Sequence, residues 1–257
     1  PRQWPRPSDR DQRQGSRSRG LAIAIKLAAG LCVLVGSAVG AAMLVMGPPP
    51  IERGEHVSTS VVDRHGQLLR AFTTREGRWR LPVGPQEVDQ RYLALLFAFE
   101  DRRFKGHFGA DPIAFARAAY QFVRHRRLVS GGSTLTMQVA RLLDGEHERT
   151  AQGKFRQVVR ALQLETALTK DEILRLYLRL APFGGNLEGV RAASIAYFGK
   201  EPRRLSIAEA ALLVALPQAP GLRRPDRFHE AARKARDRVL ARASEAGVIT
   251  TDEAQRA

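Results

Sequence analysis

Glu100 and Asp101 are adjacent carboxylates that end an apolar stretch and precede a basic loop that glycines interrupt. Glu100 directly follows Phe99 and borders the apolar face of the helix that this stretch predicts, whereas Asp101 points about 100° further around the axis. Because partial burial makes a carboxylate a better proton acceptor, Glu100 is a candidate general base. The spacing leaves open that it is instead an exposed carboxylate paired with Arg102 or Arg103.

A second polar group of residues follows the glycine pair at 131–132. Ser133 or Thr134 is a suitable N-cap for a helix that continues to Leu143. The free N–H groups and partial positive charge at such a helix start attract anions.

Thr134, Gln138 and Arg141 fall at i, i+4 and i+7 of that helix, so that one face offers a hydroxyl, an amide and a guanidinium. This face suits a diphosphate. The pattern is not a P-loop, because no Gly-Lys-Ser/Thr follows at the required spacing. An ordinary capped helix with a solvated polar face is the alternative.

Lys154 and Gln157 share one face of a predicted helix over 154–168, on which Val158, Leu162 and Leu168 are expected to face inward. The pair would place a cation and an amide over the same cleft. An ordinary exposed pair is the alternative.

The elements that position these residues are predicted to be mainly α-helical. Apolar residues from Val88 to Phe99 follow one helix face, and Asp111 with Pro112 is an N-cap and N1 pair. Capping boxes at 169–172 and 206–209 open two further helices, which end before Pro182 and Pro217. A turn at 63–66 between Val61-Val62 and Leu68-Leu69 predicts a β-hairpin, and little else reads as strand.

The N-terminal region predicts a membrane anchor. Residues 1–20 form a basic tail with almost nothing to bury, and residues 27–46 contain no charged side chain. Twenty helical residues span about 30 Å, the thickness of a bilayer core. With arginines before this helix, the positive-inside rule places the tail in the cytoplasm and everything beyond Pro50 outside.

Composition excludes some classes of function. The 257 residues include 42 basic and 26 acidic side chains, a net charge of +16 that implies an anionic partner such as nucleic acid, membrane headgroups or a phosphorylated substrate. One cysteine, Cys32, and six scattered histidines argue against disulfides and a zinc site. His107 taken alone fits a structural hydrogen-bonding role better than catalysis. A nucleic-acid binder is poorly supported, because the domain is expected to face away from the cytoplasm and lacks aromatic residues among its basic clusters.

Taken in order, these motifs resemble the peptidoglycan glycosyltransferases of glycosyltransferase family 51, over about residues 61–245. The family's first motif is matched by Glu100-Asp101-x-x-Phe104-x-x-His107-x-Gly109 in this sequence, and its second motif resembles residues 131–138. Two later motifs resemble residues 173–200 and 208–220. Residues 137–143, 181–185 and 222–227 are most similar to the penicillin-binding protein 1C branch of the class A penicillin-binding proteins.

The resemblance implies a mainly α, lysozyme-like glycosyltransferase domain, preceded by one transmembrane helix and a short β-hairpin. It implies the divisions 1–20 (tail), 21–46 (signal anchor), 47–60 (linker), 61–245 (catalytic domain) and 246–257 (connection to a following domain). The protein would lie in the bacterial inner membrane with its N-terminus in the cytoplasm and its catalytic domain in the periplasm.

The implied reaction polymerises lipid II, the undecaprenyl-diphosphate-linked disaccharide-peptide, into β-1,4 glycan strands with inversion at the anomeric carbon. Glu100 would be the base that deprotonates the 4-hydroxyl of the acceptor sugar. Substrate binding is carried over to nine further positions: Asp101, His107, Arg117, Ser133, Thr134, Gln138, Arg141, Lys154 and Gln157.

The partners that the resemblance implies are lipid II, the growing glycan chain, membrane lipids and other cell-wall synthesis proteins. No cofactor and no resident metal are expected, and a divalent cation near the diphosphate is a lesser alternative.

Two positions depart from the family pattern. Gln157 stands where the family usually has a second glutamate, and Glu165 is an imperfect substitute about 80° around the helix. Arg179 stands where Asn is common. These departures keep open an inactive cell-wall scaffold protein, and the fold also suits a lysozyme-like enzyme that cleaves glycan.

Overall fold

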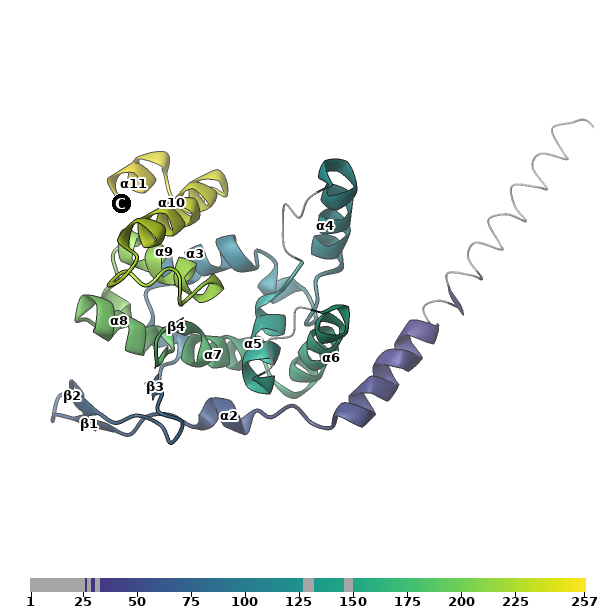
Figure 1. The fold of residues 1–257 in the computed structure, drawn as a ribbon, viewed down its shortest axis with the longest axis horizontal. Helices are drawn as coiled ribbons and strands as arrows, with labels where there is room; N and C mark the ends of the chain where they lie inside the picture. The colour runs from purple at the N-terminus through teal and green to yellow at the C-terminus, as the bar shows by residue number, and fades with distance from the viewer. Residues whose placement is uncertain (1–25, 27–28, 31–32, 127–131, 146–149) are drawn as a thin grey trace, which may run out of the picture. The chain divides into compact units, whose positions relative to one another are not determined.

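The computed structural model describes residues 26, 29–30, 33–126, 132–145 and 150–257 (Figure 1). Residues 33–46 are helical and belong to a unit separate from the compact unit Pro49–Ala257. No helix among the described residues is both long enough and apolar enough to cross a membrane. The predicted tail at 1–20 and nine positions of the predicted anchor lie outside the described residues.

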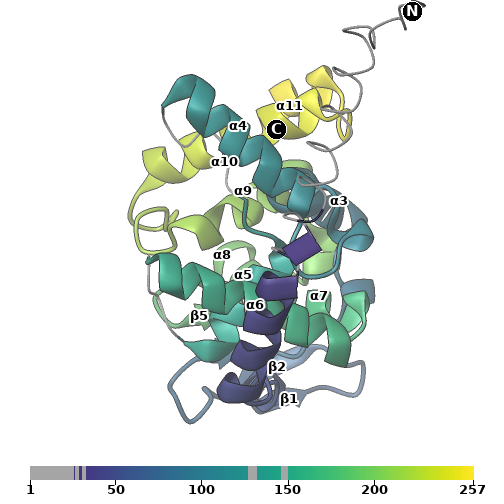
Figure 2. The same ribbon diagram turned by 90° about the vertical axis from the view of Figure 1, so that its right-hand side faces the viewer.

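The compact unit is mainly helical, as expected. Its helices are α2 (Glu52–Glu55), α3 (Gln90–Glu100), α4 (Pro112–His125), α5 (Leu135–Asp144), α6 (Ala151–Ala167), α7 (Lys170–Leu180), α8 (Val190–Phe198), α9 (Ile207–Ala215), α10 (His229–Glu245) and α11 (Thr251–Arg256). Four short 3₁₀ helices connect them: η1 (Pro85–Glu87), η2 (Phe104–Gly106), η3 (Pro202–Arg204) and η4 (Leu216–Gln218). In Figure 1, α8 to α11 lie with α3 on one side of the domain, whereas α4 and α6 lie on the other side, which faces the viewer in Figure 2.

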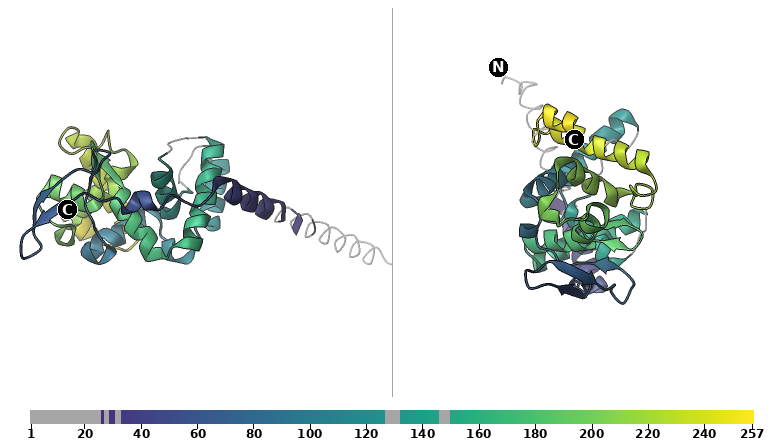
Figure 3. Two further views of the ribbon diagram at one scale, coloured as in Figure 1. Left: turned by 90° about the horizontal axis from the view of Figure 1, so that it is seen from below. Right: turned by 90° about the vertical axis from the view of Figure 1, so that its left-hand side faces the viewer.

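The predicted hairpin is present. Strand β1 (Ser60–Val62) pairs antiparallel with β2 (Leu68–Ala71), and the Asp63 carboxylate accepts hydrogen bonds from the backbone N–H groups of His65 and Gln67 in the turn. Figure 3 shows this hairpin at one edge of the domain. Sequence reasoning missed a second small sheet of β3 (Trp79–Arg80), β5 (Leu187–Glu188) and β4 (Pro182–Gly184), whose strands are too short to show a period.

The predicted helix starts are confirmed at their caps. Thr169 and Ser206 form complete capping boxes, and Asp111 accepts a hydrogen bond from the N–H of Ile113 at the start of α4. Helix α3 begins at Gln90 with Asp89 as N-cap, so Val88 precedes the helix although its side chain is buried.

The predicted inward face of α6 is confirmed only at Leu168, the residue after the helix, which is half-buried and packs against the core. Val158 and Leu162 are half-buried, whereas the buried face of α6 carries Val159 and Leu164. The reason lies in packing, because the loop at Gly109 presses against the backbone of Ala161 and sets the rotation of the helix.

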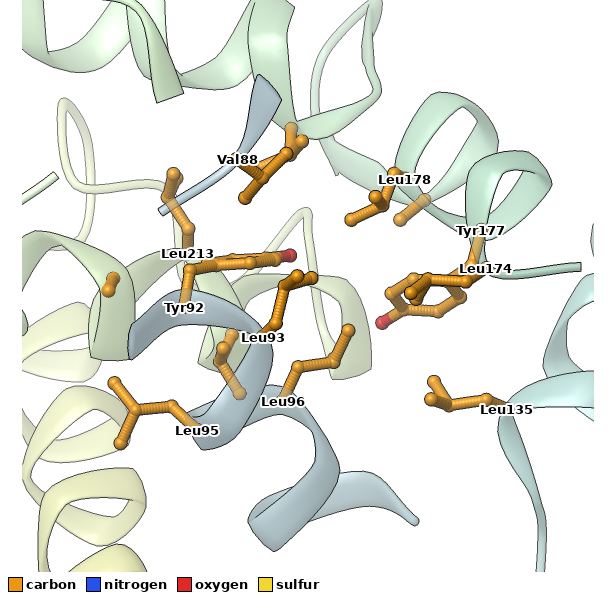
Figure 4. Close-up of a cluster of buried hydrophobic side chains, with 14 of the residues drawn as sticks. Val88, Tyr92, Leu93, Leu95, Leu96, Leu135, Leu174, Tyr177, Leu178 and Leu213 are labelled. Atoms are coloured by element: carbon orange, nitrogen blue, oxygen red, sulfur yellow. The ribbon is translucent and has the colours of Figure 1, made fainter. Parts of the chain in front are cut away.

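The hydrophobic core surrounds α3. Tyr92, Leu95 and Leu96 of α3 are fully buried and face side chains of α7 and α9, as Figure 4 shows. This packing holds the end of α3, where Glu100 lies, against a rigid part of the domain.

The segment before the hairpin is bound to the domain. Gly54 of α2 lies against Leu176, and Arg53 donates to the carbonyl of Leu143 at the end of α5. The buried guanidinium of Arg80 donates to the carbonyls of Arg53 and His56 and to the carboxylate of Glu188. The segment predicted as a linker, residues 47–60, is therefore packed against the domain from Arg53 onward.

Candidate active site

Two adjoining cavities form one cleft across the face of the domain, with volumes of about 500 and 630 Å³. Glu100 lines the first cavity and Lys154 the second. The cavities share five lining residues: Ser133, Arg141, Gln157, Pro217 and Gln218. One continuous site therefore connects a carboxylate to a group of cations.

Glu100 is held by two side-chain amides. Its Oε2 accepts a hydrogen bond from Nε2 of Gln138 at 2.8 Å, and its Oε1 accepts one from Nε2 of Gln218 at 2.8 Å. An ionised carboxylate offers about four acceptor positions, so acceptor capacity remains for a substrate hydroxyl. Neither Arg102 nor Arg103 pairs with Glu100: Arg102 donates to the carbonyl of Ala98, and Arg103 forms an ion pair with Asp111.

Asp101 organises the wall of the site. Its buried carboxylate is 2.9 Å from Nε2 of His107 and accepts a hydrogen bond from the N–H of Leu135 at 2.9 Å. Asp101 lines the first cavity, whereas His107, with a side chain 1% exposed, does not. The structure thus gives His107 a supporting position behind Asp101.

Two buried tyrosines lie within electrostatic reach of Glu100. Burial raises the pKa of Tyr92 and of Tyr177, and the charge of Glu100 raises both further. Both phenols therefore stay neutral near pH 7.

Thr134 is the N-cap of α5, one of the two residues that the sequence allowed. Its hydroxyl donates to the carbonyl of Gly109 at 2.5 Å and accepts from the N–H of Met137 at 3.1 Å. Ser133 instead turns toward α6, where its hydroxyl accepts a hydrogen bond from Nζ of Lys154 at 2.5 Å. The N-terminus of α5 therefore opens on the cleft with Lys154 beside it.

Arg141 joins the two cavities on the same face of α5 as Thr134 and Gln138, as predicted. Its Nε is buried and has no hydrogen-bond partner among the described residues. Burial, and to a lesser extent the charge of Arg141, lowers the pKa of Lys154. Two cations held close together, with no carboxylate between them among the residues that the structure describes, favour an anionic ligand.

The cleft includes a cation, Arg242, that sequence reasoning did not place there. Arg117 of α4 lines the first cavity, as the resemblance implied, and Arg242 near the end of α10 lines it too. The guanidinium of Arg242 lies 5.4 Å from the ring centroid of Phe99. Arg242 is 142 residues from Glu100 along the chain and has no local pattern that could have revealed it.

Of the two residues that depart from the family pattern, one lies in the cleft and the other lies outside it. Gln157 lines both cavities, whereas Arg179 donates to the carbonyl of Val83 and to the carboxylate of Glu55, away from the cleft. Glu165 does not replace the missing carboxylate. It lines neither cavity and accepts hydrogen bonds from Thr136 and Lys170.

A metal centre has no ligand set among the described residues, where no three His, Cys, Asp or Glu side chains cluster closely enough to hold an ion.

Residues 65–244 match the transglycosylase family, which covers more than half of the chain. The chain belongs to this family. The matched range contains every residue that lines the cleft.

The transglycosylase domain is similar to penicillin-binding proteins. It is 53% identical over 193 residues to penicillin-binding protein 1C of Escherichia coli (strain K12), covering 75% of this chain and 25% of that protein. It is 38% identical over 200 residues to penicillin-binding protein 1A of Aquifex aeolicus (strain VF5), covering 78% of this chain and 27% of that protein. The chain thus spans about a quarter of the length of these relatives.

Among solved structures, penicillin-binding protein 1A from Haemophilus influenzae matches with a TM-score of 0.42 and 20% identity, covering 78% of this chain and 20% of that one.

Proposed function

We propose that the transglycosylase domain is a peptidoglycan glycosyltransferase that polymerises lipid II into β-1,4 glycan strands. The family match and the similarity to class A penicillin-binding proteins support the substrate class. The observation that carries the proposal is the Glu100 carboxylate, held by two amides in a cleft that continues to Arg141 and Lys154.

The proposed chemistry uses Glu100 as general base. Its carboxylate takes the proton of the acceptor 4-hydroxyl as that oxygen forms a bond to C1 of the donor sugar. The bond from C1 to the undecaprenyl diphosphate breaks, and the electron pair leaves with the diphosphate. Attack opposite the α-linked leaving group gives a β linkage, and the proton then passes from Glu100 to solvent.

The cations of the cleft stabilise the leaving group. Negative charge grows on the diphosphate as the bond breaks, so donors fixed beforehand stabilise the transition state more than the ground state. Lys154, Arg141 and the N-terminus of α5 lie together on this side of the cleft. We propose that they replace a divalent cation, so that the reaction needs no metal.

The membrane anchor is part of the same proposal. Residues 21–46 would form a signal anchor in the inner membrane, with residues 1–20 in the cytoplasm and the catalytic domain in the periplasm. The net charge of +16 suits an anionic membrane that carries the substrate. Protease added to spheroplasts should digest the domain, whereas digestion only after lysis would contradict this orientation.

The deciding experiment is polymerisation of labelled lipid II by the full chain in detergent or liposomes. Wild type should produce glycan strands and Glu100→Gln should reduce the rate at least about 100-fold, the range for loss of a general base. Glu245→Gln makes the same chemical change at an exposed position outside the cleft and should leave the rate unchanged.

Two results would replace the proposal. Bound lipid II without polymer from the wild type would favour the scaffold alternative. Breakdown of polymeric glycan without any lipid-linked donor would favour a glycan-cleaving enzyme.

A further inference from the structure

We infer that Gln218 and Arg223 are positioning residues that hold the Glu100 carboxylate in its reactive orientation, an inference that rests on the proposed function. Gln218 ends η4, 118 residues beyond Glu100, and donates from Nε2 to Oε1 of Glu100 at 2.8 Å. Gln138 holds the other oxygen from α5. The carboxylate is thus clamped from two elements, and rotation of its plane would break a hydrogen bond on each side.

Arg223 determines which end of the Gln218 amide faces Glu100. Its Nη1 donates to Oε1 of Gln218 at 3.2 Å. Because a guanidinium has only donors, it binds the carbonyl end of the amide and leaves the NH₂ end for the carboxylate. With a hydrophobic residue at position 223, the Gln218 amide would be free to turn over and present its oxygen to Glu100. That contact would be repulsive, because both oxygens are hydrogen-bond acceptors.

Arg223 is itself fixed to the core. The same Nη1 donates to the carbonyl of Ala215, the fully buried last residue of α9, at 2.7 Å. Burial, together with the nearby charge of Arg238, lowers the pKa of Arg223, whereas the charge of Glu100 raises it. The guanidinium therefore lies within electrostatic reach of Glu100 and acts on it through one intervening amide.

The arrangement also strengthens the donor. A cation on the carbonyl oxygen polarises the amide and makes its NH₂ a better hydrogen-bond donor. The series of hydrogen bonds from Ala215 through Arg223 and Gln218 to Glu100 thus fixes the position of the base relative to α9. It also places the positive charge of Arg223 one side chain away from the base.

The test is a double-mutant cycle in the lipid II polymerisation assay with the full chain. Gln218→Met keeps the length of the side chain and removes the donor, and it should lower kcat about 10- to 100-fold with little change in KM, the range for one hydrogen bond to a charged group. Arg223→Met should lower kcat in the same way by a smaller factor. The double variant should be no slower than Gln218→Met, because both residues act through one path.

Controls separate positioning from folding. Arg227→Met removes an exposed arginine of the same loop and should polymerise at the wild-type rate. Arg223→Lys retains a donor and should recover part of the kcat that Arg223→Met loses, and all variants should melt within a few degrees of wild type.

Three results would overturn the inference while leaving the proposed function intact. They are wild-type kcat in Gln218→Met, multiplicative losses in the double variant, or losses that follow the melting temperature alone. Failure of the wild type itself to polymerise would instead refute the proposed function.

Discussion

The carboxylate of Asp101 accepts a hydrogen bond from the backbone N–H of Leu135, the first residue of α5, at 2.9 Å. This contact fastens the helix that carries Gln138 and Arg141 to the residue next to Glu100. A negative charge at a helix N-terminus is also favourable electrostatically. The buried carboxylate of Asp101 therefore holds the proposed base and the cationic face of α5 in a fixed relative position.

Asp101→Asn tests this contact. Oδ2 of Asp101 lies 2.9 Å from both the N of Leu135 and Nε2 of His107, and Oδ1 lies 3.1 Å from the same ring nitrogen. An Asn whose oxygen keeps the first two contacts turns its NH₂ group toward the imidazole, so this buried donor has no acceptor. We expect the free energy of unfolding to fall by about 1–3 kcal/mol, the cost of an unsatisfied buried polar group. Urea denaturation measures this, and an unchanged midpoint would contradict the role assigned to Asp101.

Gly109→Ala should disrupt the contact between the active-site loop and α6. Gly109 has a φ of 74°, and a Cβ there would lie 2.8 Å from the backbone carbonyl of Ala161. Strain and overlap together should cost at least about 2 kcal/mol. Gly106→Ala is the matched control, because no atom lies within 4 Å of its added Cβ and its φ is not positive. Equal thermal stability of the two variants would refute the argument.

Lys154 should make the protein more stable as pH rises. Burial, with Arg141 nearby, lowers its pKa in the folded state, so between that lowered pKa and the usual 10.5 the unfolded chain binds more protons. Stability therefore increases with pH across this window, and charged Lys154 costs stability below it.

The variant Lys154→Met checks this sign. It should be more stable than wild type at pH 7, and the difference should narrow toward pH 10, as thermal melts at several pH values would show. Its affinity for lipid II should fall, because a cation of the cleft is lost. A stability difference that does not vary with pH would count against the prediction.

Gln157→Glu should change the metal dependence of the reaction. Gln157 lines both cavities, and a carboxylate there would face the diphosphate side of the cleft. We expect wild-type polymerisation to be insensitive to EDTA, and Gln157→Glu to be inhibited by EDTA and restored by Mg²⁺, since carboxylate oxygens bind this ion. Glu165→Gln, which changes a carboxylate outside the cleft, should leave EDTA insensitivity as it is. Loss of wild-type activity in EDTA would overturn the metal-free proposal.

Local signals in the sequence were sufficient for the helix caps, the hairpin and the polar face of α5. Each depends on residues within four positions of one another, such as Thr169 with Glu172 or Thr134 with Gln138, so backbone geometry alone relates them. The motif order was sufficient for the family, and with it for Glu100 as the candidate base.

Tertiary packing decided the rest. The choice of Thr134 over Ser133 as N-cap depends on the carbonyl of Gly109, and the buried face of α6 depends on the same loop. The contacts of Glu100 with Gln138 and Gln218 join residues 38 and 118 positions apart. No local period encodes such distances, because they arise only when the buried faces of α3, α5 and α9 pack into one core.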